Sequence, residues 1–194
     1  RQIYDTLVYL EPQQKKIIPG LATEWTISND DLVYTFLLRR DVLFQDGTVF
    51  NSKAVARNLD RIASLHSEGM KASIYLSEYY LGYEVIDDYT IKLKLSQPYA
   101  PFLDGLAQPY LGMTSPNSIE LYSASRYQFH QVGTGPFILV NYLPGKEIDL
   151  RRNPDYKWGP SFYSESSPNS VNEIQFTFVD DAKERLSKVA TSSD

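Results

Sequence analysis

Residues 19–62 constrain the fold more than any other stretch, because three local patterns follow one another within them. Apolar residues alternate with polar ones over residues 25–38, with a short polar run in the middle, which predicts two strands joined by a turn. Asp46-Gly47 predicts a second turn, since glycine adopts a positive φ without steric cost. Apolar residues then recur three and four positions apart, which predicts a helix capped by Asn51 or Ser52. This order of hairpin, turn and helix indicates a mixed fold.

The remaining chain predicts further hairpins and short helices. In order, we expect a helical tail at 1–8, a loop at 9–18, a second hairpin at 83–95, a short helix at 101–107, a crossing strand at 110–114, a helix at 116–127 capped near Ser115, strands at 137–142, 147–150 and 171–179, a long surface loop at 153–172 and a last helix capped by Asp180. The tyrosine-rich stretch 73–83 favours a packed stripe over a platform for stacking a ligand. The predicted fold class is α+β, built of mixed β-hairpins and helices.

Composition excludes several classes of function. With 194 residues, 42% of them hydrophobic, the chain is long and apolar enough to bury a core. Its net charge of −5, with basic residues only in isolated pairs, argues against nucleic acid as a partner. No apolar run reaches the about 20 residues that a membrane helix needs, and any export signal would lie outside this sequence. The absence of cysteine excludes disulfides and thiolate metal sites.

The residue types that carry catalysis form no recognisable pattern. His66 and His130 lie far apart in a sequence without a metal-binding motif, and Gly133-Thr134-Gly135-Pro136 lacks the spacing of a phosphate-binding loop. The aspartate pairs at 30–31, 87–88 and 180–181 predict two hairpin turns and a helix start. We therefore expect no catalytic residue, no cofactor and no metal site. A hydrolase that uses two carboxylates stays open as an alternative, because such partners meet only in the fold.

Several motifs occur in a recognisable order along nearly the whole chain. They are Pro19-Gly20-Leu21-Ala22 with Glu24-Trp25, Tyr34-Thr35-Phe36 with Leu38-Arg39, Phe44-Gln45-Asp46-Gly47-Thr48, Val85-Ile86-Asp87-Asp88-Tyr89-Thr90, Gly133-Thr134-Gly135-Pro136-Phe137 and Arg152-Asn153-Pro154-Asp155-Tyr156. This set resembles the N-terminal part of the family 5 extracellular solute-binding proteins, the oligopeptide-, dipeptide- and nickel-binding receptors of ABC importers. One departure is Lys157, which separates Tyr156 from Trp158 where the family often has adjacent aromatics.

The resemblance implies part of a type II (class C) periplasmic-binding-protein fold, with the second large lobe absent. Residues 5–114 would be a subdomain that resembles the small extra domain of peptide-binding receptors, and residues 115–194, with 1–4, an incomplete part of the first ligand-binding lobe. The implied function is non-catalytic capture of a solute between two lobes, for an ABC-type importer whose permease subunits are the partners. A peptide is expected rather than nickel or an oligosaccharide. The implied location is the periplasmic or extracellular face of the cell membrane, with any lipid anchor outside this sequence.

Two places are expected to contribute to the ligand cleft: the loop after the first long helix, where the resemblance implies an aromatic near the ligand, and the crossing strand close to the hinge. The residues expected there are His66, Met70, Tyr75, Tyr110, Met113 and Thr114. A solute-binding-like sensor domain of a transcription regulator is an alternative that shares this fold. A signal peptide upstream, as opposed to a DNA-binding motif, would distinguish the two.

Overall fold

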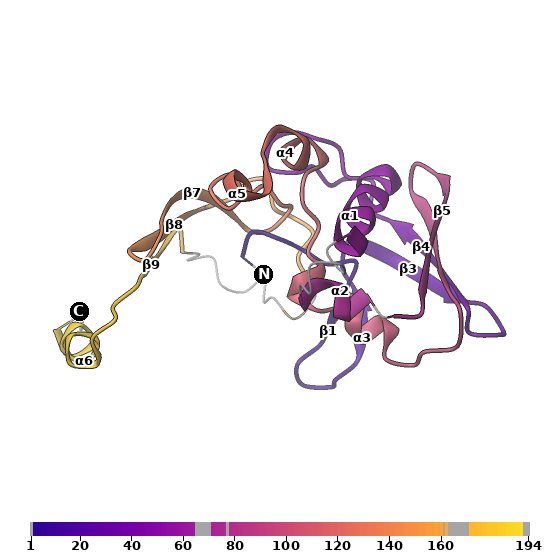
Figure 1. The fold of residues 1–194 in the computed structure, drawn as a ribbon, viewed down its shortest axis with the longest axis horizontal. Helices are drawn as coiled ribbons and strands as arrows, with labels where there is room; N and C mark the ends of the chain where they lie inside the picture. Colours follow the sequence, from indigo (N-terminus) through magenta and orange to yellow (C-terminus); the bar gives the residue numbers. More distant parts are fainter. Residues whose placement is uncertain (1, 65–70, 77, 161, 163–170, 192–194) are drawn as a thin grey trace.

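The computed structural model describes residues 2–64, 71–76, 78–160, 162 and 171–191. Its elements are β1 (Val8–Leu10), β2 (Ile17–Pro19), β3 (Ala22–Ile27), β4 (Val33–Leu38), α1 (Ser52–Ser64), α2 (Lys71–Leu76), β5 (Tyr80–Asp87), β6 (Thr90–Leu95), α3 (Phe102–Leu106), η2 (Pro109–Leu111), α4 (Pro116–Leu121), α5 (Ala124–Tyr127), β7 (Phe137–Leu143), β8 (Glu147–Arg152), β9 (Glu173–Thr177) and α6 (Ala182–Thr191). The strands form three antiparallel sheets, in the orders β1-β2, β3-β4-β6-β5 and β7-β8-β9. Figure 1 shows the two larger sheets on either side of the N-terminal segment. The predicted α+β class is confirmed.

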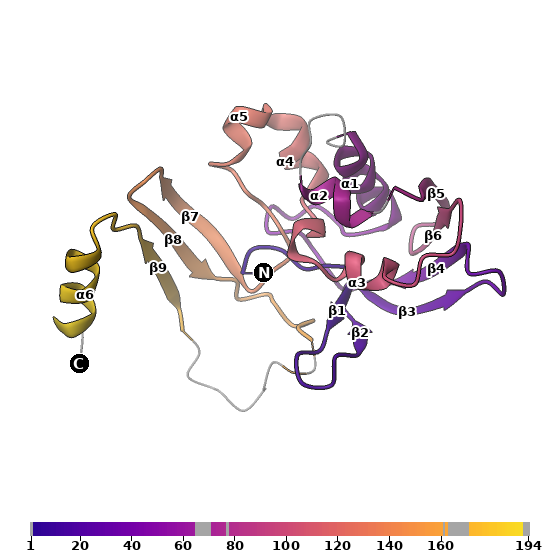
Figure 2. The same ribbon diagram turned by 60° about the horizontal axis from the view of Figure 1, so that its bottom comes forward.

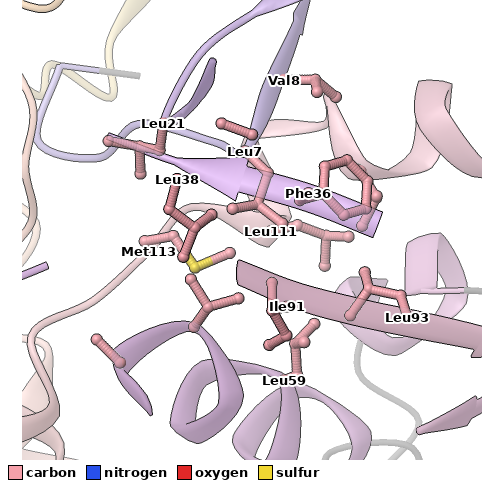
Figure 3. Close-up of a cluster of buried hydrophobic side chains, with 14 of the residues drawn as sticks. Leu7, Val8, Leu21, Phe36, Leu38, Leu59, Ile91, Leu93, Leu111 and Met113 are labelled. Atoms are coloured by element: carbon pink, nitrogen blue, oxygen red, sulfur yellow. The ribbon is translucent and has the colours of Figure 1, made fainter. Parts of the chain in front are cut away.

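The four-stranded sheet carries the core. On its covered face, Phe36 in β4 pairs with Ile91 in β6, and both side chains are fully buried. Their sequence neighbours Thr35 and Lys92 pair on the opposite face, as the alternation of strand side chains requires. Figure 3 shows Leu59 of α1 beside Ile91, so the helix packs on this apolar face. Within the hairpins themselves β3 pairs with β4 and β5 pairs with β6, so both predicted hairpins are confirmed.

The turn and helix that follow the first hairpin form as predicted. Gly47 has a φ of 85°, in the left-handed region that favours glycine. Asn51 caps α1, since its Oδ1 accepts a hydrogen bond from the backbone N–H of Ala54 at 3.0 Å. Ser52 instead donates its hydroxyl proton to the carbonyl oxygen of Asp87. This contact fastens the start of α1 to the turn of the second hairpin.

The three-stranded sheet has one apolar face and one polar face. Ile148 in β8 pairs with Phe176 in β9 on the apolar face, and Asp149 pairs with Gln175 on the polar face, where Gln175 Nε2 donates to Asp149 Oδ1 at 3.0 Å. Within the described strands of this sheet only Leu150 is fully buried, whereas Phe176 is 45% exposed. The sheet extends away from the core and carries α6 at its far end (Figure 2). It therefore contributes little to the hydrophobic core.

The first 18 residues differ from the expectation. Residues 2–7 form no helix, and β1 and β2 pair across the stretch expected to be a loop. Ile3 and Leu7 are spaced four apart as in a helix, but the carbonyl groups of this segment accept hydrogen bonds from distant backbone amides instead. Tertiary contacts have overridden a weak helical pattern.

Two helix predictions need correction. The helix expected at 116–127 is two short helices, α4 and α5, with Ser115 at the N-cap of the first, where its hydroxyl oxygen accepts from the N–H of Ser118. The last helix is capped by Asp181 and not by Asp180, because Asp181 Oδ1 accepts from the N–H of Glu184 at 2.8 Å. Among the described helices, none combines the length and hydropathy needed to cross a membrane.

Two further predictions need correction, one in the type of structure and one in its burial. The strand predicted at 110–114 is not a strand. A single 3-10 turn at its start is followed by extended chain outside any sheet. Pro109, which lacks an N–H, suits the first position of that turn. The described beginning of the predicted surface loop at 153–172 is a loop without helix or strand, but it is anchored in the protein, since Asn153 and Trp158 are 6% and 5% exposed. Its long-range partners are not visible in the local sequence.

Candidate functional site

The N-terminal segment, residues 2–7, is the element to which the other parts are fastened. Its carbonyl groups accept backbone hydrogen bonds from three distant places: Ile3 from Gly135 at 2.8 Å, Asp5 from Met113 at 2.9 Å and Thr6 from Leu21 at 3.0 Å. The segment therefore joins the core, the chain near Met113 and the glycine-rich turn that precedes the second sheet.

Asp5 is the polar centre of this junction. Its side chain is 1% exposed, and its carboxyl group accepts hydrogen bonds from Tyr9 Oη, Thr134 Oγ1 at 2.9 Å, Tyr156 Oη at 3.1 Å and Trp158 Nε1 at 3.0 Å. A buried carboxyl group is tolerated when donors replace its lost hydration. Asp5 thus ties β1, the glycine-rich turn and the stretch before β9 to one point.

The crossing segment, residues 109–115, is held between the N-terminal segment and α1. Asn58 of α1 is fully buried, and its side-chain amide makes two hydrogen bonds to the main chain of Thr114. Its Nδ2 donates to the carbonyl oxygen at 2.7 Å, and its Oδ1 accepts from the N–H at 2.9 Å. Ser115 Oγ donates to Asp46 Oδ2 at 2.6 Å. Burial acts to raise the pKa of Asp46, but the hydrogen bonds to its carboxylate, the strongest from Ser115, hold that pKa below its usual value.

A stacked tyrosine pair lies at the start of the crossing segment. The rings of Tyr75 in α2 and Tyr110 in η2 have centroids 5.2 Å apart and planes inclined by 10°. Tyr110 is 51% exposed, while Tyr75 packs against the core. The pair is positioned by a close backbone approach, because a Cβ on Gly105 in α3 would overlap the carbonyl oxygen of Tyr75. An exposed aromatic ring on a rigid support is suited to packing against a ligand.

A chain of hydroxyl groups lies at the end of the crossing segment. Thr114 Oγ1 lies 2.8 Å from Tyr127 Oη, which lies 2.9 Å from Tyr4 Oη, and Tyr4 donates to Gln131 Oε1 at 3.1 Å. Burial, followed by the neighbouring Tyr127, raises the pKa of Tyr4 far above its ordinary value, so this hydroxyl keeps its proton. The guanidinium carbon of Arg61 lies 5.7 Å from the centroid of the Tyr127 ring.

The residues expected near a ligand fall into three groups. His66 and Met70 lie outside the described residues. Tyr75 and Tyr110 are brought together in the stacked pair. Met113 and Thr114 are 1% and 2% exposed, so their side chains support the crossing segment from within. Figure 3 shows Met113 in the core near Leu38 and α1.

Sequence reasoning missed Tyr4, Asp5, Asn58 and Arg61. Asn58 carried a usable signal, since it falls on the apolar stripe of α1, three residues after Val55, where a polar side chain needs a buried partner. For Asp5 the sequence offers no comparable signal, because its donors come from positions up to 153 residues away.

Two open cavities flank the second sheet. One, of about 600 Å³, is lined by β7, β8 and β9. The other, of about 700 Å³, lies between the turn at 41–47 and residues 151–158, with acidic and basic side chains in its lining. Among the described residues, neither lining contains serine, threonine, cysteine or histidine that could serve as a nucleophile or an imidazole base. Within the described part of the chain, no three histidine, cysteine, aspartate or glutamate side chains are grouped to hold a metal ion.

Comparison with known proteins gives consistent similarities in sequence and structure. Residues 16–192 match the profile of the bacterial extracellular solute-binding proteins, family 5 Middle. The glutathione-binding protein GsiB of Salmonella choleraesuis (strain SC-B67) is 39% identical over 156 residues, which are 80% of this chain and 30% of that protein. NikA from Brucella suis in complex with Fe(III)-EDTA superposes with a TM-score of 0.80 at 27% identity, over 98% of this chain and 36% of NikA. DppA from Helicobacter pylori in complex with the peptide STSA gives 0.79 at 29% identity, over 98% and 39%. The chain thus spans about a third of the length of these proteins.

Proposed function

The chain belongs to the family 5 bacterial extracellular solute-binding proteins, and from this membership we propose that it forms part of the solute receptor of an ABC-type importer. The profile match over residues 16–192 is the observation that carries the proposal. Such a receptor captures its solute without changing it chemically, and permease subunits at the membrane receive it. The periplasmic or extracellular face of the membrane is where this capture takes place.

We assign the two larger sheets to two different domains of the receptor. Residues 5–114 form a small extra domain, and residues 115–194, together with 1–4, form part of the first ligand-binding lobe. In support, the hydrophobic core cluster comes from residues 7–113, with Trp158 as its one described member from farther along the chain. The solute is held between this part of the receptor and a second lobe, and closure of the two is favoured by contacts that exist only in the closed state.

A peptide-class solute, glutathione included, is the ligand that we propose. GsiB is a glutathione-binding protein by name, and DppA is in complex with a peptide. NikA is in complex with an iron chelate, so a metal chelate is the alternative ligand to be tested beside peptides. In the proposed site Tyr110 and Tyr75 contact the solute, and Met113 and Thr114 hold the crossing segment behind them. His66 and Met70, which lie outside the described residues, are proposed as further contacts on the sequence alone.

A panel of solutes tests this proposal in the full-length protein that carries the chain. Glutathione, short peptides, a nickel–histidine chelate and a disaccharide are added in turn, and the melting temperature is recorded. A solute at 100 times its Kd stabilises the folded state by about 2.7 kcal/mol, so we expect a peptide-class solute to raise the melting temperature. A rise with the chelate or the disaccharide alone would contradict the peptide assignment, and no rise with any solute would contradict solute binding.

Replacing Tyr110 by alanine should weaken peptide binding about 2- to 10-fold, because an aromatic contact contributes about 0.5–1.5 kcal/mol beyond its buried area. The measurement is calorimetric titration of the full-length protein. Tyr89→Ala is the matched control, since the Tyr89 ring contacts Arg40 in the hairpin sheet and not the crossing segment. Equal affinities of the wild type and Tyr110→Ala would remove Tyr110 from the site.

A further inference from the structure

Arg61 and the buried Asn58 both lie on the side of α1 that faces the end of the crossing segment. The two residues are three positions apart in α1, which places them on one side of the helix. Asn58 grips Thr114, and the Arg61 guanidinium lies over the ring of Tyr127, whose hydroxyl contacts Thr114. The cation is therefore positioned beside the hydroxyl chain at the end of the crossing segment.

The Nε of Arg61 has no acceptor within the described part of the chain. Its Nε is buried and makes no hydrogen bond, and no carboxylate of the described residues forms an ion pair with it. Asp60, the acidic residue next to it in sequence, accepts from Tyr83 Oη at 2.9 Å instead. A buried donor without a partner costs free energy and calls for a specific explanation, such as a ligand that completes it.

The described hydroxyl groups beside Arg61 bond to one another and to Gln131, and none of their recorded hydrogen bonds involves Arg61. A consistent direction runs along the chain from Thr114 to Tyr127, then to Tyr4, and ends at the amide oxygen of Gln131. In this direction every hydroxyl proton of the chain is donated within it. The guanidinium is the charged member of this group, and a planar fork of N–H groups matches the two oxygens of a carboxylate.

We propose that Arg61 binds a carboxylate group of the solute, with Tyr127 holding the guanidinium in place. This inference rests on the proposed function and narrows it, because it makes a negatively charged end of the peptide a determinant of recognition. It adds a residue of the long helix to the site, at the opposite end of the crossing segment from Tyr110. Tyr127 acts as a positioning residue through the stacking contact.

Glutathione and its diethyl ester test the proposal, because the ester removes both negative charges of the peptide and keeps its backbone. Affinities of the full-length protein are measured for both compounds with the wild type, Arg61→Gln and Arg57→Gln. Arg57 lies one turn earlier in α1, is exposed, and changes charge in the same way, so it is the matched control. Melting temperatures without solute, and Arg61→Lys as a second variant, show whether folding is retained.

We expect the wild type and Arg57→Gln to prefer glutathione over the ester, and Arg61→Gln to lose about 10- to 100-fold of that preference, as expected for a hydrogen-bonded charge pair. Arg61→Lys should keep part of it, since the charge remains but the fork is lost. A preference unchanged in Arg61→Gln would overturn the role of Arg61 and leave the proposed function standing. An equal loss of affinity for both compounds would do the same. A wild type that binds neither compound would overturn the peptide assignment and this inference together.

Discussion

Replacing Asp5 by alanine should lower the free energy of unfolding of this chain by about 3–5 kcal/mol, because several buried donors would lose their acceptor at once. Tyr9, Thr134, Tyr156 and Trp158 all donate to this one carboxyl group, and Tyr9 is only 2% exposed. Trp158 retains one acceptor, the carbonyl oxygen of Thr134 at 3.1 Å, which limits the loss at that residue. The expected consequence is separation of the N-terminal segment from the stretch around Trp158.

Urea unfolding followed by tryptophan fluorescence measures this effect. The chain has two tryptophans, and Trp158 bonds directly to Asp5, so its emission in the folded state should also shift. Asp5→Asn is the control: it keeps the volume and one acceptor oxygen, and should lose less than Asp5→Ala. An Asp5→Ala variant within 1 kcal/mol of the wild type would contradict the role of Asp5 as the polar centre, since one lost hydrogen bond alone is worth about that much.

Replacing Gly133 by alanine should destabilise the chain by about 3 kcal/mol, at the upper end of the usual cost of overpacking. The added Cβ would overlap the carbonyl oxygen of Ile3 and lie 2.6 Å from Cδ1 of Tyr4. The first of these is a main-chain atom that accepts a hydrogen bond from Gly135, so moving it would break that bond. The N-terminal segment would have to move away from Gly133.

Gly145→Ala separates this steric effect from the general cost of removing a glycine. Gly145 has a φ of 72° and no heavy atom within 4 Å of the position of a Cβ, so alanine there meets backbone strain without overlap. We expect a loss of about 1–2 kcal/mol for Gly145→Ala in the same urea titration. Equal losses at the two positions would contradict the close approach of Ile3 to Gly133.

The hairpins and α1 were predictable because their information is local. In β4 and β6 every second residue is apolar, so the sequence alone assigns Phe36 and Ile91 to the same covered face. Asn51 and Gly47 likewise act within a few residues of their own positions. The family resemblance, which rests largely on these segments, agrees with the profile match over residues 16–192.

The junction was not predictable because its information is non-local. Residues 2–7 have no regular secondary structure of their own, and their backbone carbonyl groups accept hydrogen bonds from amides far along the chain. The spacing of Ile3 and Leu7 imitates a helix, whereas the real constraint is the slot formed around Gly133 and Gly135. Trp158 was assigned to a surface loop for the same reason, since Asp5 and Thr134 hold it in the core.

The candidate site was predictable in part. The sequence marked the region before Tyr75 and the chain from Tyr110 to Thr114, and the structure stacks Tyr75 on Tyr110. It could not show that Met113 points into the core, because an apolar residue in an irregular segment has no periodicity to orient it. Arg61 was hidden in a helix whose other charged residues are solvated, and only its unpaired buried Nε distinguishes it.

The most direct test of the account is to locate the bound solute on the protein. A tripeptide with a photoreactive side chain is bound to the full-length protein and irradiated, and the labelled residues are identified by mass spectrometry with unlabelled peptide as competitor. The account predicts competable labels on α2 or on the crossing segment at residues 109–115. Competable labels confined to the outer face of the four-stranded sheet, or no competable label at all, would contradict it.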